Sequence, residues 1–477
     1  MLLSLIPIVL LLIHGQLLSG LEIPGLESQI LKFPSVEDVL KIPLHFVGGV
    51  PTLSFGVGTP TQPVTGVFDT GSLMTWIMSD QCNSSVCTGV ANKFHRKESS
   101  TNHDLGYTIE IDYIDGSSVR LLPELDKLTL LDDIVIPEHL MAEAIEVYYP
   151  KTYPTSANGR LGVGDFGAFI KYVANLEGVI KDKTGLLKGI LTRAVGDDRT
   201  ATGYAASGSP DFKKRDGVHA PFYWTLGSDP SMHDESDKLY NLRLMSPSAK
   251  VLSPYWKLPL HGIKLVGQVE NAVNDTKKED QPTQKKASLL SSPLIKRAPS
   301  PSPSSSSSSS SELLLRLDLP NSAYGSIDSS TPYLHLPRKL SQALNQKLGA
   351  EYDSSLELYT IPCDRKADGA PLLVFEFEGV DALLPAHQYI IKKNQKCHTA
   401  ILDNIKSKNN NDDEDEDQIH LGGPFFRSYY IEYYTAERKV AIAESPAKLG
   451  LLRETSVDGS YHLTSLIDKG LDVLSSV

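Results

Sequence analysis

Short apolar runs with alternating polar positions dominate the first third of the chain. Residues 52–57 (TLSFGV), 65–68 (TGVF) and 107–113 (YTIEIDY) are rich in Val, Ile, Thr and Tyr, and Gly, Pro and Asp interrupt them. This period of two, with dense turn residues, predicts an all-β region over residues 48–135. Residues 166–217 show a less regular pattern that we expect to be helical and loop-like, and β-type runs resume near 221–226 and 255–266.

The first twenty residues (MLLSLIPIVLLLIHGQLLSG) form an apolar run that ends in small residues. This pattern is typical of a secretory signal peptide, although it lacks the usual positive charge at its start. The alternative is an uncleaved membrane anchor, but His14, Gly15 and Gln16 interrupt the run before it reaches the ~20 apolar residues that a bilayer requires. We therefore expect a secreted, extracellular protein without a membrane anchor after signal removal. The sequons at Asn83 and Asn274 agree with that route.

Two polar segments are predicted to be solvated insertions. Residues 271–311 are charged and then Ser/Pro-rich, so they cannot bury enough apolar surface to form a core. They contain Lys296-Arg297, a candidate dibasic processing site. Residues 405–418 (IKSKNNNDDEDEDQ) are acidic, but they lack the spaced Asp/Asn and Gly positions of a calcium loop.

The composition narrows the classes of function. The 477 residues contain 46 Lys and Arg against 58 Asp and Glu, a net charge of −12, without a long basic run. A nucleic-acid binder is therefore disfavoured. The 40% hydrophobic content suffices for a sizeable core, and the length indicates two domains or one two-lobed unit. The four cysteines do not form paired Cys-x-x-Cys motifs, so we expect no metal site.

A chemical motif occurs once in each half of the chain. VFDTGS (67–72) and SIDSST (326–331) both place an Asp after an apolar strand end and before small hydroxyl residues. Leu161-Gly162 begins 92 residues after Asp69, and Leu421-Gly422 begins 93 residues after Asp328. A duplicated β unit that supplies one Asp per half is the simplest explanation. Taken singly, an Asp at such a position is more often a turn former.

At these residues the chain resembles the pepsin-like aspartic proteases, and more narrowly the secreted, fungal-type ones. Five segments carry the resemblance in order: 56–76, 111–118, 255–267, 327–337 and 421–444. The resemblance implies an all-β, bilobal fold with the active-site cleft between two pseudo-symmetric lobes. It places an N-terminal lobe at 48–245, a C-terminal lobe at 246–455 and a C-terminal tail at 456–477. Residues 21–47, which lack the family's β signature, are interpreted as a propeptide.

The resemblance also implies the chemistry. Two carboxyls that share one proton can activate a water and polarise a peptide carbonyl, so Asp69 and Asp328 are the expected catalytic pair of an acid endopeptidase. Polypeptides would be the substrates, no cofactor is expected, and the protein would be a monomer. The other expected site residues are those of the active-site turns (Thr70, Gly71, Ser72, Ser329, Ser330, Thr331) and of the flap (Tyr113, Asp115, Gly116, Ser117). Of these, Gly71, Ser72 and Thr331 are expected to donate hydrogen bonds to the carboxylates.

Three further residues receive an interpretation from the pattern. Trp76 is expected to pack and to support the flap tyrosine, and His420 is interpreted as a loop histidine. Ser330 stands where the family usually has Gly, and its Cβ would crowd the other turn or require a backbone angle that suits Gly. This departure leaves open a catalytically inactive relative that acts as a binding or inhibitor protein.

The resemblance favours disulfides Cys82–Cys87 and Cys363–Cys397 among the three pairings that four cysteines allow. An oxidising compartment, which secretion implies, agrees with bonded cysteines.

Overall fold

A computed structural model describes most of the chain from Leu40 onward. The described residues are 40–90, 92–130, 134–153, 157–165, 202–205, 222–226, 238–246, 255–267, 312–366, 370–393, 395–404, 418–434, 437–445 and 449–455. The predicted signal peptide (1–20), the 271–311 insertion with Lys296-Arg297, the sequon at Asn274 and the tail (456–477) lie outside these residues. So do residues 21–39 of the predicted propeptide and 405–417 of the acidic loop.

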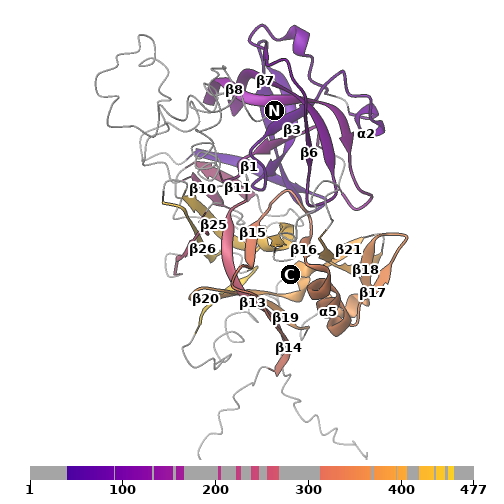
Figure 1. Cartoon of the computed structure of the whole chain (residues 1–477), viewed down its shortest axis with the longest axis vertical. Coiled ribbons are helices and arrows are strands. Elements are labelled where there is room, and N and C mark those ends of the chain that lie inside the picture. The colour runs from indigo at the N-terminus through magenta and orange to yellow at the C-terminus, as the bar shows by residue number, and fades with distance from the viewer. Residues whose placement is uncertain are drawn as a thin grey trace, which may run out of the picture.

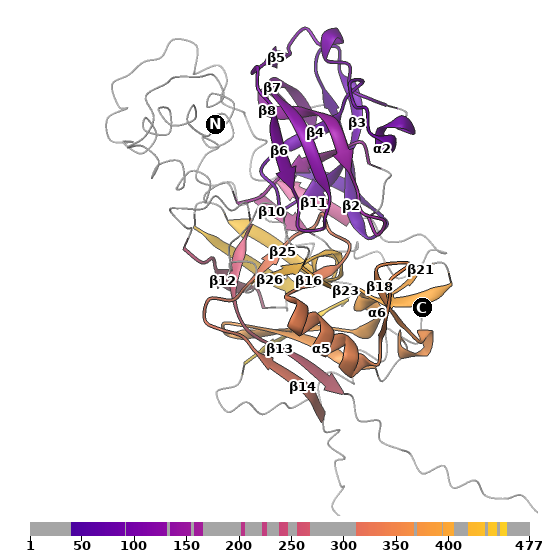
Figure 2. The same cartoon turned by 45° about the vertical axis from the view of Figure 1, so that its right-hand side comes forward.

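Two β lobes lie one above the other (Figures 1 and 2), which confirms the expected all-β, bilobal fold. In the N-terminal lobe, coloured indigo to purple, the long strand β7 alternates buried and partly buried positions at both of its ends. The elements of this lobe are β2 (Val50–Val57), β3 (Gln62–Asp69), β4 (Thr75–Met78), α2 (Ser85–Thr88), η2 (Arg96–Glu98), β5 (His103–Asp104), β6 (Ile109–Asp112), β7 (Ser118–Leu130), β8 (Ile134–Tyr148) and β9 (Gly159–Gly162).

The C-terminal lobe, coloured pink through orange to yellow, contains a large sheet, a smaller sheet and short helices. The elements of the larger sheet are β13 (Lys257–Gly267), β14 (Glu312–Asp318), β15 (Tyr324–Ile327), β16 (Leu334–Leu336), β19 (Leu372–Phe377), β20 (Val380–Leu384), β23 (Ile401–Asp403), β24 (Gln418–Leu421) and β27 (Leu451–Glu454). The smaller sheet contains β17 (Glu351–Asp353), β18 (Leu358–Ile361), β21 (Ile390–Lys393) and β22 (Lys396–Thr399). The helices are α5 (Arg338–Leu348), η5 (Cys363–Lys366), α6 (Ala386–Tyr389) and α7 (Gly423–Phe426).

A sheet built from strands of the first, middle and last parts of the chain joins the lobes. Its strands follow the order β12-β26-β25-β10-β11-β1 and then continue into β2. They are β1 (Leu40–Val47), β10 (Thr202–Ala205), β11 (Phe222–Leu226), β12 (Tyr240–Arg243), β25 (Tyr429–Tyr434) and β26 (Lys439–Glu444). Strand β1 occupies the last residues of the segment interpreted as a propeptide, and it buries Ile42 and Leu44. Strand β10 lies within 166–217, where the pattern had indicated helix and loop.

The two lobes repeat one strand arrangement around the two aspartates. In the N-terminal lobe the order is β3-β9-β4-β8, with β3 parallel to β9 and β4 parallel to β8. In the C-terminal lobe it is β15-β24-β16-β23, with β15 parallel to β24 and β16 parallel to β23. Asp69 pairs with Gly162 in register, and Ile327 pairs with Leu421 just before Asp328. The similar spacing of the motifs in the sequence therefore reflects a duplicated fold.

The apolar core continues through the junction of the lobes. Phe68, which precedes Asp69, has its ring centroid 5.2 Å from that of Trp224 in β11 and 6.2 Å from that of Phe426 in α7. All three side chains are buried. Burial of large aromatic rings contributes strongly to stability, so the end of β3 is held firmly.

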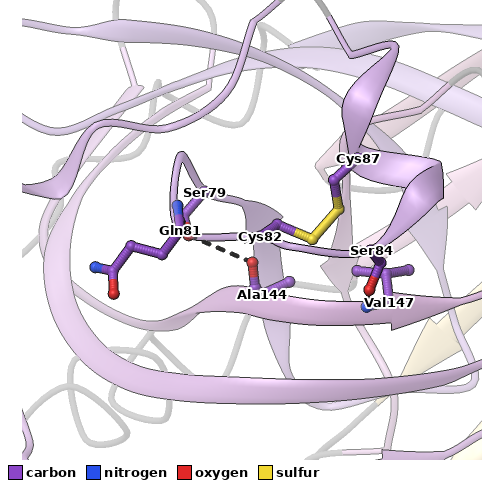
Figure 3. The surroundings of a disulfide bond; sticks show 7 residues. All are labelled: Ser79, Gln81, Cys82, Ser84, Cys87, Ala144 and Val147. Carbon is purple, nitrogen blue, oxygen red and sulfur yellow. Dashed lines mark hydrogen bonds between the residues drawn. A yellow bond between two sulfur atoms is a disulfide. The ribbon is translucent and has the colours of Figure 1, made fainter.

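Both expected disulfides are present. Cys82–Cys87 closes a small loop after β4, and Figure 3 shows this loop lying on β8. The backbone amide of Val147 donates to Ser84 Oγ (2.9 Å), which ties the loop to β8. Cys363–Cys397 joins η5 to β22 in the C-terminal lobe.

A search of the described residues for membrane-crossing helices found none with the required length and apolar character.

Candidate active site

The two aspartate turns bond to each other across the lobes. The backbone amide of Thr70 donates to Ser329 Oγ (3.0 Å), and the amide of Ser329 donates to Thr70 Oγ1 (3.0 Å). The two hydroxyls then donate to carbonyls of the opposite lobe, Thr70 Oγ1 to Ile327 (2.9 Å) and Ser329 Oγ to Phe68 (2.5 Å). All these groups are buried, so each turn satisfies the polar groups of the other. This reciprocal bonding fixes the position of the aspartate that precedes each hydroxyl residue.

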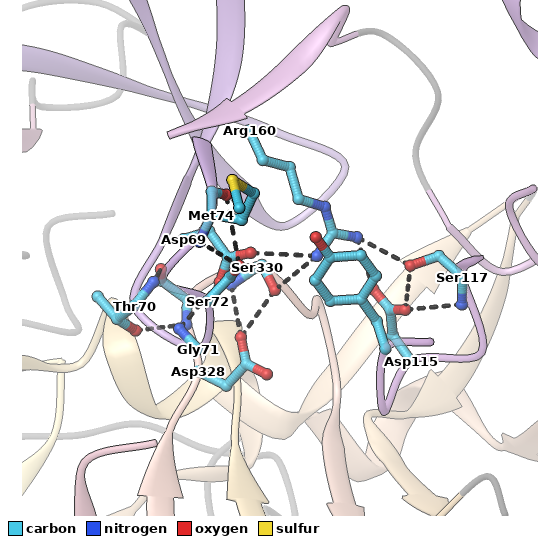
Figure 4. A network of polar contacts seen from close by, with 12 residues as sticks. Asp69, Thr70, Gly71, Ser72, Met74, Asp115, Ser117, Arg160, Asp328 and Ser330 are labelled. Atoms are coloured by element: carbon cyan, nitrogen blue, oxygen red, sulfur yellow. Dashed lines mark hydrogen bonds and ion pairs between the residues drawn. The ribbon is translucent and has the colours of Figure 1, made fainter. Parts of the chain in front are cut away.

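The carboxyls of Asp69 and Asp328 lie on either side of Gly71 (Figure 4). Asp69 Oδ1 accepts the amide of Gly71 (2.9 Å). A Cβ added to Gly71 would lie 2.7 Å from Asp328 Cγ and 2.8 Å from both of its carboxyl oxygens. Only glycine therefore fits this close approach. Asp69 and Asp328 are 0% and 3% exposed, so the pair is shielded from solvent in this conformation.

Ser330 holds the second carboxyl. Its amide and its Oγ both donate to Asp328 Oδ1, at 3.0 and 2.8 Å. Its backbone lies outside the left-handed region, because the non-glycine residues with positive φ in the described part of the chain are Glu357, Gln395 and Arg438. The concern that this position requires glycine for its backbone angle was therefore wrong. The serine instead adds a hydroxyl donor to the site.

Burial governs the protonation of the pair. Burial and then the neighbouring Asp69 charge raise the pKa of Asp328 to about 7, against the hydrogen bond from Ser330. Burial also raises the pKa of Asp69, and the positive charge of Arg160 opposes that rise. Two close carboxyls titrate as a unit, because like charges in one buried site cannot both form easily. In acid, the arrangement favours one ionised and one protonated carboxyl.

The predicted flap is the hairpin of β6 and β7, and its turn contains Tyr113, Asp115, Gly116 and Ser117. The amide of Tyr113 donates to the Ser117 carbonyl (2.8 Å), and Gly116 adopts a φ of +79°, which suits glycine in the turn. Asp115 Oδ1 accepts the amide and the hydroxyl of Ser117, at 2.8 and 2.5 Å. Trp76 Nε1 donates to Tyr113 OH (2.8 Å), which confirms the expected support of the flap tyrosine.

Arg160, which was not among the residues predicted from the sequence, joins this flap turn to the aspartates. Its side chain is completely buried. Nη1 lies 3.2 Å from both Asp69 Oδ2 and Ser330 Oγ, while Nη2 lies 3.1 Å from Asp115 Oδ2 and 2.9 Å from Ser117 Oγ (Figure 4). The signal was present, because a charged residue directly before Leu161-Gly162 is unusual in a strand that pairs with the strand leading to Asp69.

Two expected donors make other contacts. Ser72 Oγ accepts the amide of Met74 (3.2 Å), and Thr331 Oγ1 accepts the amide of Tyr333 (3.3 Å) and lies 3.0 Å from His335 Nε2. Among the described residues, the hydrogen bonds to the two carboxylates come from Gly71, from the amide and hydroxyl of Ser330 and from Arg160. The two amides were expected, whereas the Ser330 hydroxyl and Arg160 were not.

The interpretation of His420 as a loop histidine was wrong. It lies in β24, is completely buried, and its Nδ1 is 3.0 Å from Ser326 Oγ and 3.9 Å from Asp328 Oδ2. Burial lowers the pKa of His420 to about 3, so the ring is neutral over most of the acid range. The parallel pairing of β15 and β24 brings it to the site, which its place in the sequence could not show.

Comparison with known proteins agrees with this geometry. The family model of the eukaryotic aspartyl proteases matches residues 52–183 and 305–445. Pepsin A from Callithrix jacchus is 42% identical over 69 residues, which cover 14% of this chain and 18% of that protein. Vacuolar protease A from Neurospora crassa is 40% identical over 88 residues, 18% of this chain and 22% of that protein. These two matches thus span about a fifth of each relative.

A longer match extends over most of the chain. The vacuolar aspartic protease of Candida albicans is 24% identical over 387 residues, which cover 81% of this chain and 73% of that protein. The two ranges of the family model contain Asp69 and Asp328, one in each, together with the strands that repeat between the lobes. Because these ranges make up more than half of its length, the chain belongs to the family of eukaryotic aspartyl proteases.

Proposed function

We propose that the protein is an aspartic endopeptidase that hydrolyses peptide bonds with a water activated by Asp69 and Asp328. The observation that carries the proposal is the position of the two buried carboxyls beside Gly71, held by turns that bond across the lobes. The ionised carboxylate would take a proton from the water while the protonated one donates to the carbonyl oxygen of the peptide. The tetrahedral intermediate would then collapse to a carboxylic acid and an amine without a covalent enzyme intermediate. The amine nitrogen takes the proton that the water gave up, and the hydroxyl formed from the carbonyl returns its proton to the pair.

The proposed pH range follows from the one-proton state. Above about pH 7, Asp328 loses its proton and the pair loses its acid. When the pH falls below the pKa of Asp69, the pair loses its base, and the Arg160 charge favours an ionised Asp69. Activity should therefore rise and fall with pH on the acid side of neutrality, as a bell-shaped profile.

Polypeptides are the proposed substrates, bound by a monomer that needs no cofactor. Tyr113 would help position the peptide, and Asp115 and Ser117 would bond its backbone once their contacts with Arg160 open. Exclusion of water by a closed flap would strengthen these contacts.

Replacement of either carboxyl tests the proposal. Asp69→Asn and Asp328→Asn should each lower hydrolysis of a denatured protein at about pH 3–5 by about 1,000-fold or more, because one member of the pair cannot do both proton transfers. Both variants should stay folded. Asp328→Asn should keep a midpoint of thermal unfolding near that of the wild type, whereas Asp69→Asn removes an ion-pair partner of the buried Arg160 and should lower the midpoint. Asp80→Asn, at a half-exposed aspartate, is the control. A statine-type transition-state analogue should block the wild type. Full activity in either variant would refute the assignment of Asp69 and Asp328 as the catalytic pair.

A second candidate is an inactive binding or inhibitor protein of the same fold. Ser330 in place of the family glycine and the ion pair of Arg160 with Asp69 favour it, because both add contacts at the carboxyls. The same assay separates the candidates. An inactive relative would bind the statine-type analogue or a peptide without cleaving any substrate between about pH 2 and 7.

We also propose that residues 1–20 direct the chain into the secretory pathway, with lobes at about 48–245 and 246–455. Two relatives are named as vacuolar proteases, so the end of the route could be the vacuole as well as the exterior. Removal of a propeptide should end before Leu40, because β1 pairs with both β2 and β11. N-terminal sequencing of the exported protein should give a start between residues 22 and 40. A start at Leu21 would mean that only the signal peptide is removed, and a start beyond Val47 would mean that β1 is dispensable.

A further inference from the structure

Arg160 connects two parts of the molecule, the aspartate turns at the base of the site and the flap turn of the β6–β7 hairpin. One nitrogen of its guanidinium contacts Asp69 and Ser330 at the base of the site, and the other contacts Asp115 and Ser117 in the flap turn. Its Cζ lies 3.9 Å from the centroid of the Tyr113 ring. The planar fork of arginine suits such a bridge, because it donates in two directions from one rigid group.

Two carboxylates lie within ion-pair distance of the Arg160 guanidinium, which bridges the flap turn and the aspartate turns. Asp69 and Asp115 form ion pairs with Arg160, and the rings of Tyr113, Tyr149 and Tyr153 surround it. Asp328 interacts electrostatically with Asp69, and the neutral side chains of His420 and Tyr255 lie near Asp328. A cation buried this deeply is stable only with such partners. Although burial opposes it, Tyr153, Asp115 and Asp69 raise the pKa of Arg160, so the guanidinium is charged throughout the acid range.

We propose that Arg160 is a positioning residue that holds the flap turn over the two aspartates and keeps the ionised form on Asp69. This inference rests on the proposed peptidase function and adds a residue to its mechanism. In the free protein the bridge keeps the carboxyls covered, and a peptide gains access when the contacts to Asp115 and Ser117 open. The charge then continues to favour the base form of Asp69.

Four variants separate the charge of Arg160 from its geometry. Arg160→Met removes both, Arg160→Lys keeps a charge but loses the two-sided fork, and Asp115→Asn leaves Arg160 but removes the flap carboxylate. Arg120→Met, at a half-exposed arginine of the same hairpin that pairs with Glu110 and Glu146, is the matched control. Arg160→Met should fold in acid, where the carboxyls left without it can take up protons.

The first measurement is the pH profile of kcat/KM on an internally quenched peptide. Arg160→Met should move the profile to higher pH by about one to three units, the usual effect of an adjacent opposite charge. Asp115→Asn should move it to lower pH, because the Asp115 charge raises the pKa of both Asp69 and Asp328. Arg160→Lys and Arg120→Met should keep the profile of the wild type.

The second measurement is amide hydrogen exchange of residues 109–118 in the absence of substrate. Loss of the bridge should speed exchange of the Tyr113, Gly116 and Ser117 amides by about tenfold or more in Arg160→Met, Arg160→Lys and Asp115→Asn. Arg120→Met should exchange as the wild type does, because its ion pairs are solvent-exposed.

The results distinguish the inference from the function on which it rests. A uniform loss of kcat/KM at every pH, with unchanged flap exchange, would reduce Arg160 to a packing residue and overturn the inference. A wild type that cleaves no peptide would refute the proposed function. In that case, unchanged flap exchange in Arg160→Met and Arg160→Lys would still overturn the bridge, and faster exchange would support it.

Discussion

At the scale of single residues, the two aspartate turns are similar in plan and different in detail. Gly71 leaves room for the Asp328 carboxyl, which would lie 2.7 Å from a Cβ at that position. Ser330 occupies the corresponding place in the other turn and donates to Asp328 through both its amide and its hydroxyl. The hydroxyl also lies 3.2 Å from Arg160 Nη1, so the serine and the arginine belong to one network. Ser330 stands where the family usually has Gly, and its added hydroxyl therefore has hydrogen-bond partners within the site.

Ser330→Gly should keep the fold and shift the pH dependence. The lost hydroxyl donor lowers the pKa of Asp328 in the wild type, so its removal should raise that pKa and move the alkaline limb of kcat/KM to higher pH. Ser355→Gly is a matched control, because Ser355 donates to Asp353 Oδ1 through its amide and hydroxyl in the same way at an exposed turn. An unchanged alkaline limb in Ser330→Gly, or an equal shift in both variants, would show that the hydroxyl does not tune the pair.

At the level of elements, the two disulfides close loops of different length. Cys82–Cys87 closes a separation of 5 residues beside β4, whereas Cys363–Cys397 closes a separation of 34 in the small sheet of the C-terminal lobe. A crosslink lowers the entropy of the unfolded chain more when the loop is longer. The second disulfide should therefore contribute more to the free energy of unfolding.

Paired serine substitutions test this difference. The Cys363→Ser, Cys397→Ser variant should lose about 4 kcal/mol of unfolding free energy, and the Cys82→Ser, Cys87→Ser variant about 2 kcal/mol, on the chain-entropy account. Urea unfolding at one acid pH measures both against the wild type. If the short loop costs more than the long one, contacts such as that of Ser84 with β8, rather than chain entropy, decide its stability.

At the scale of the whole molecule, the lobes are joined in two places. The sheet of β12, β26, β25, β10, β11 and β1 joins them along one side, and the bonded aspartate turns join them at the site. Acidic groups are buried in both lobes, and burial raises the pKa of Asp69, Asp328, Glu124, Glu143 and Asp381. The folded state then retains protons that the unfolded state releases, so these groups favour stability in acid.

Glu124 gives a test of this charge arrangement. Burial raises its pKa to about 8, so its contribution is complete below its ordinary pKa and disappears as the pH rises through about 8. Burial lowers the pKa of His335 and His420, so these histidines reduce the free energy of unfolding only below about pH 6.5, where the unfolded state binds their protons. Between pH 6.5 and 8, the free energy of unfolding should therefore fall by about 1–2 kcal/mol more in the wild type than in Glu124→Gln. Urea unfolding at both pH values measures it, with the exposed Glu110→Gln as control. Parallel slopes for wild type and Glu124→Gln would contradict the prediction.

Local and repeated features of the protein could be predicted from the order of its residues alone. Alternating apolar positions predicted the β runs at 52–57, 221–226 and 255–266, because a strand with one buried face must alternate. The motif spacing predicted a duplicated unit with one Asp in each half, and parallel pairing in both lobes confirms it. The two cysteine pairs were also expected correctly through the family resemblance.

Only the tertiary structure decided which distant side chains meet. Arg160 and His420 reach the aspartates through parallel strand pairs, and such pairing joins residues with no local signal in the sequence. Strand β1 was assigned to a propeptide, and one of its two partners, β11, lies far along the chain, although the other, β2, follows it directly. Periodicity specifies which face of a strand is buried, whereas the charge that a buried side chain encounters depends on its neighbours in space.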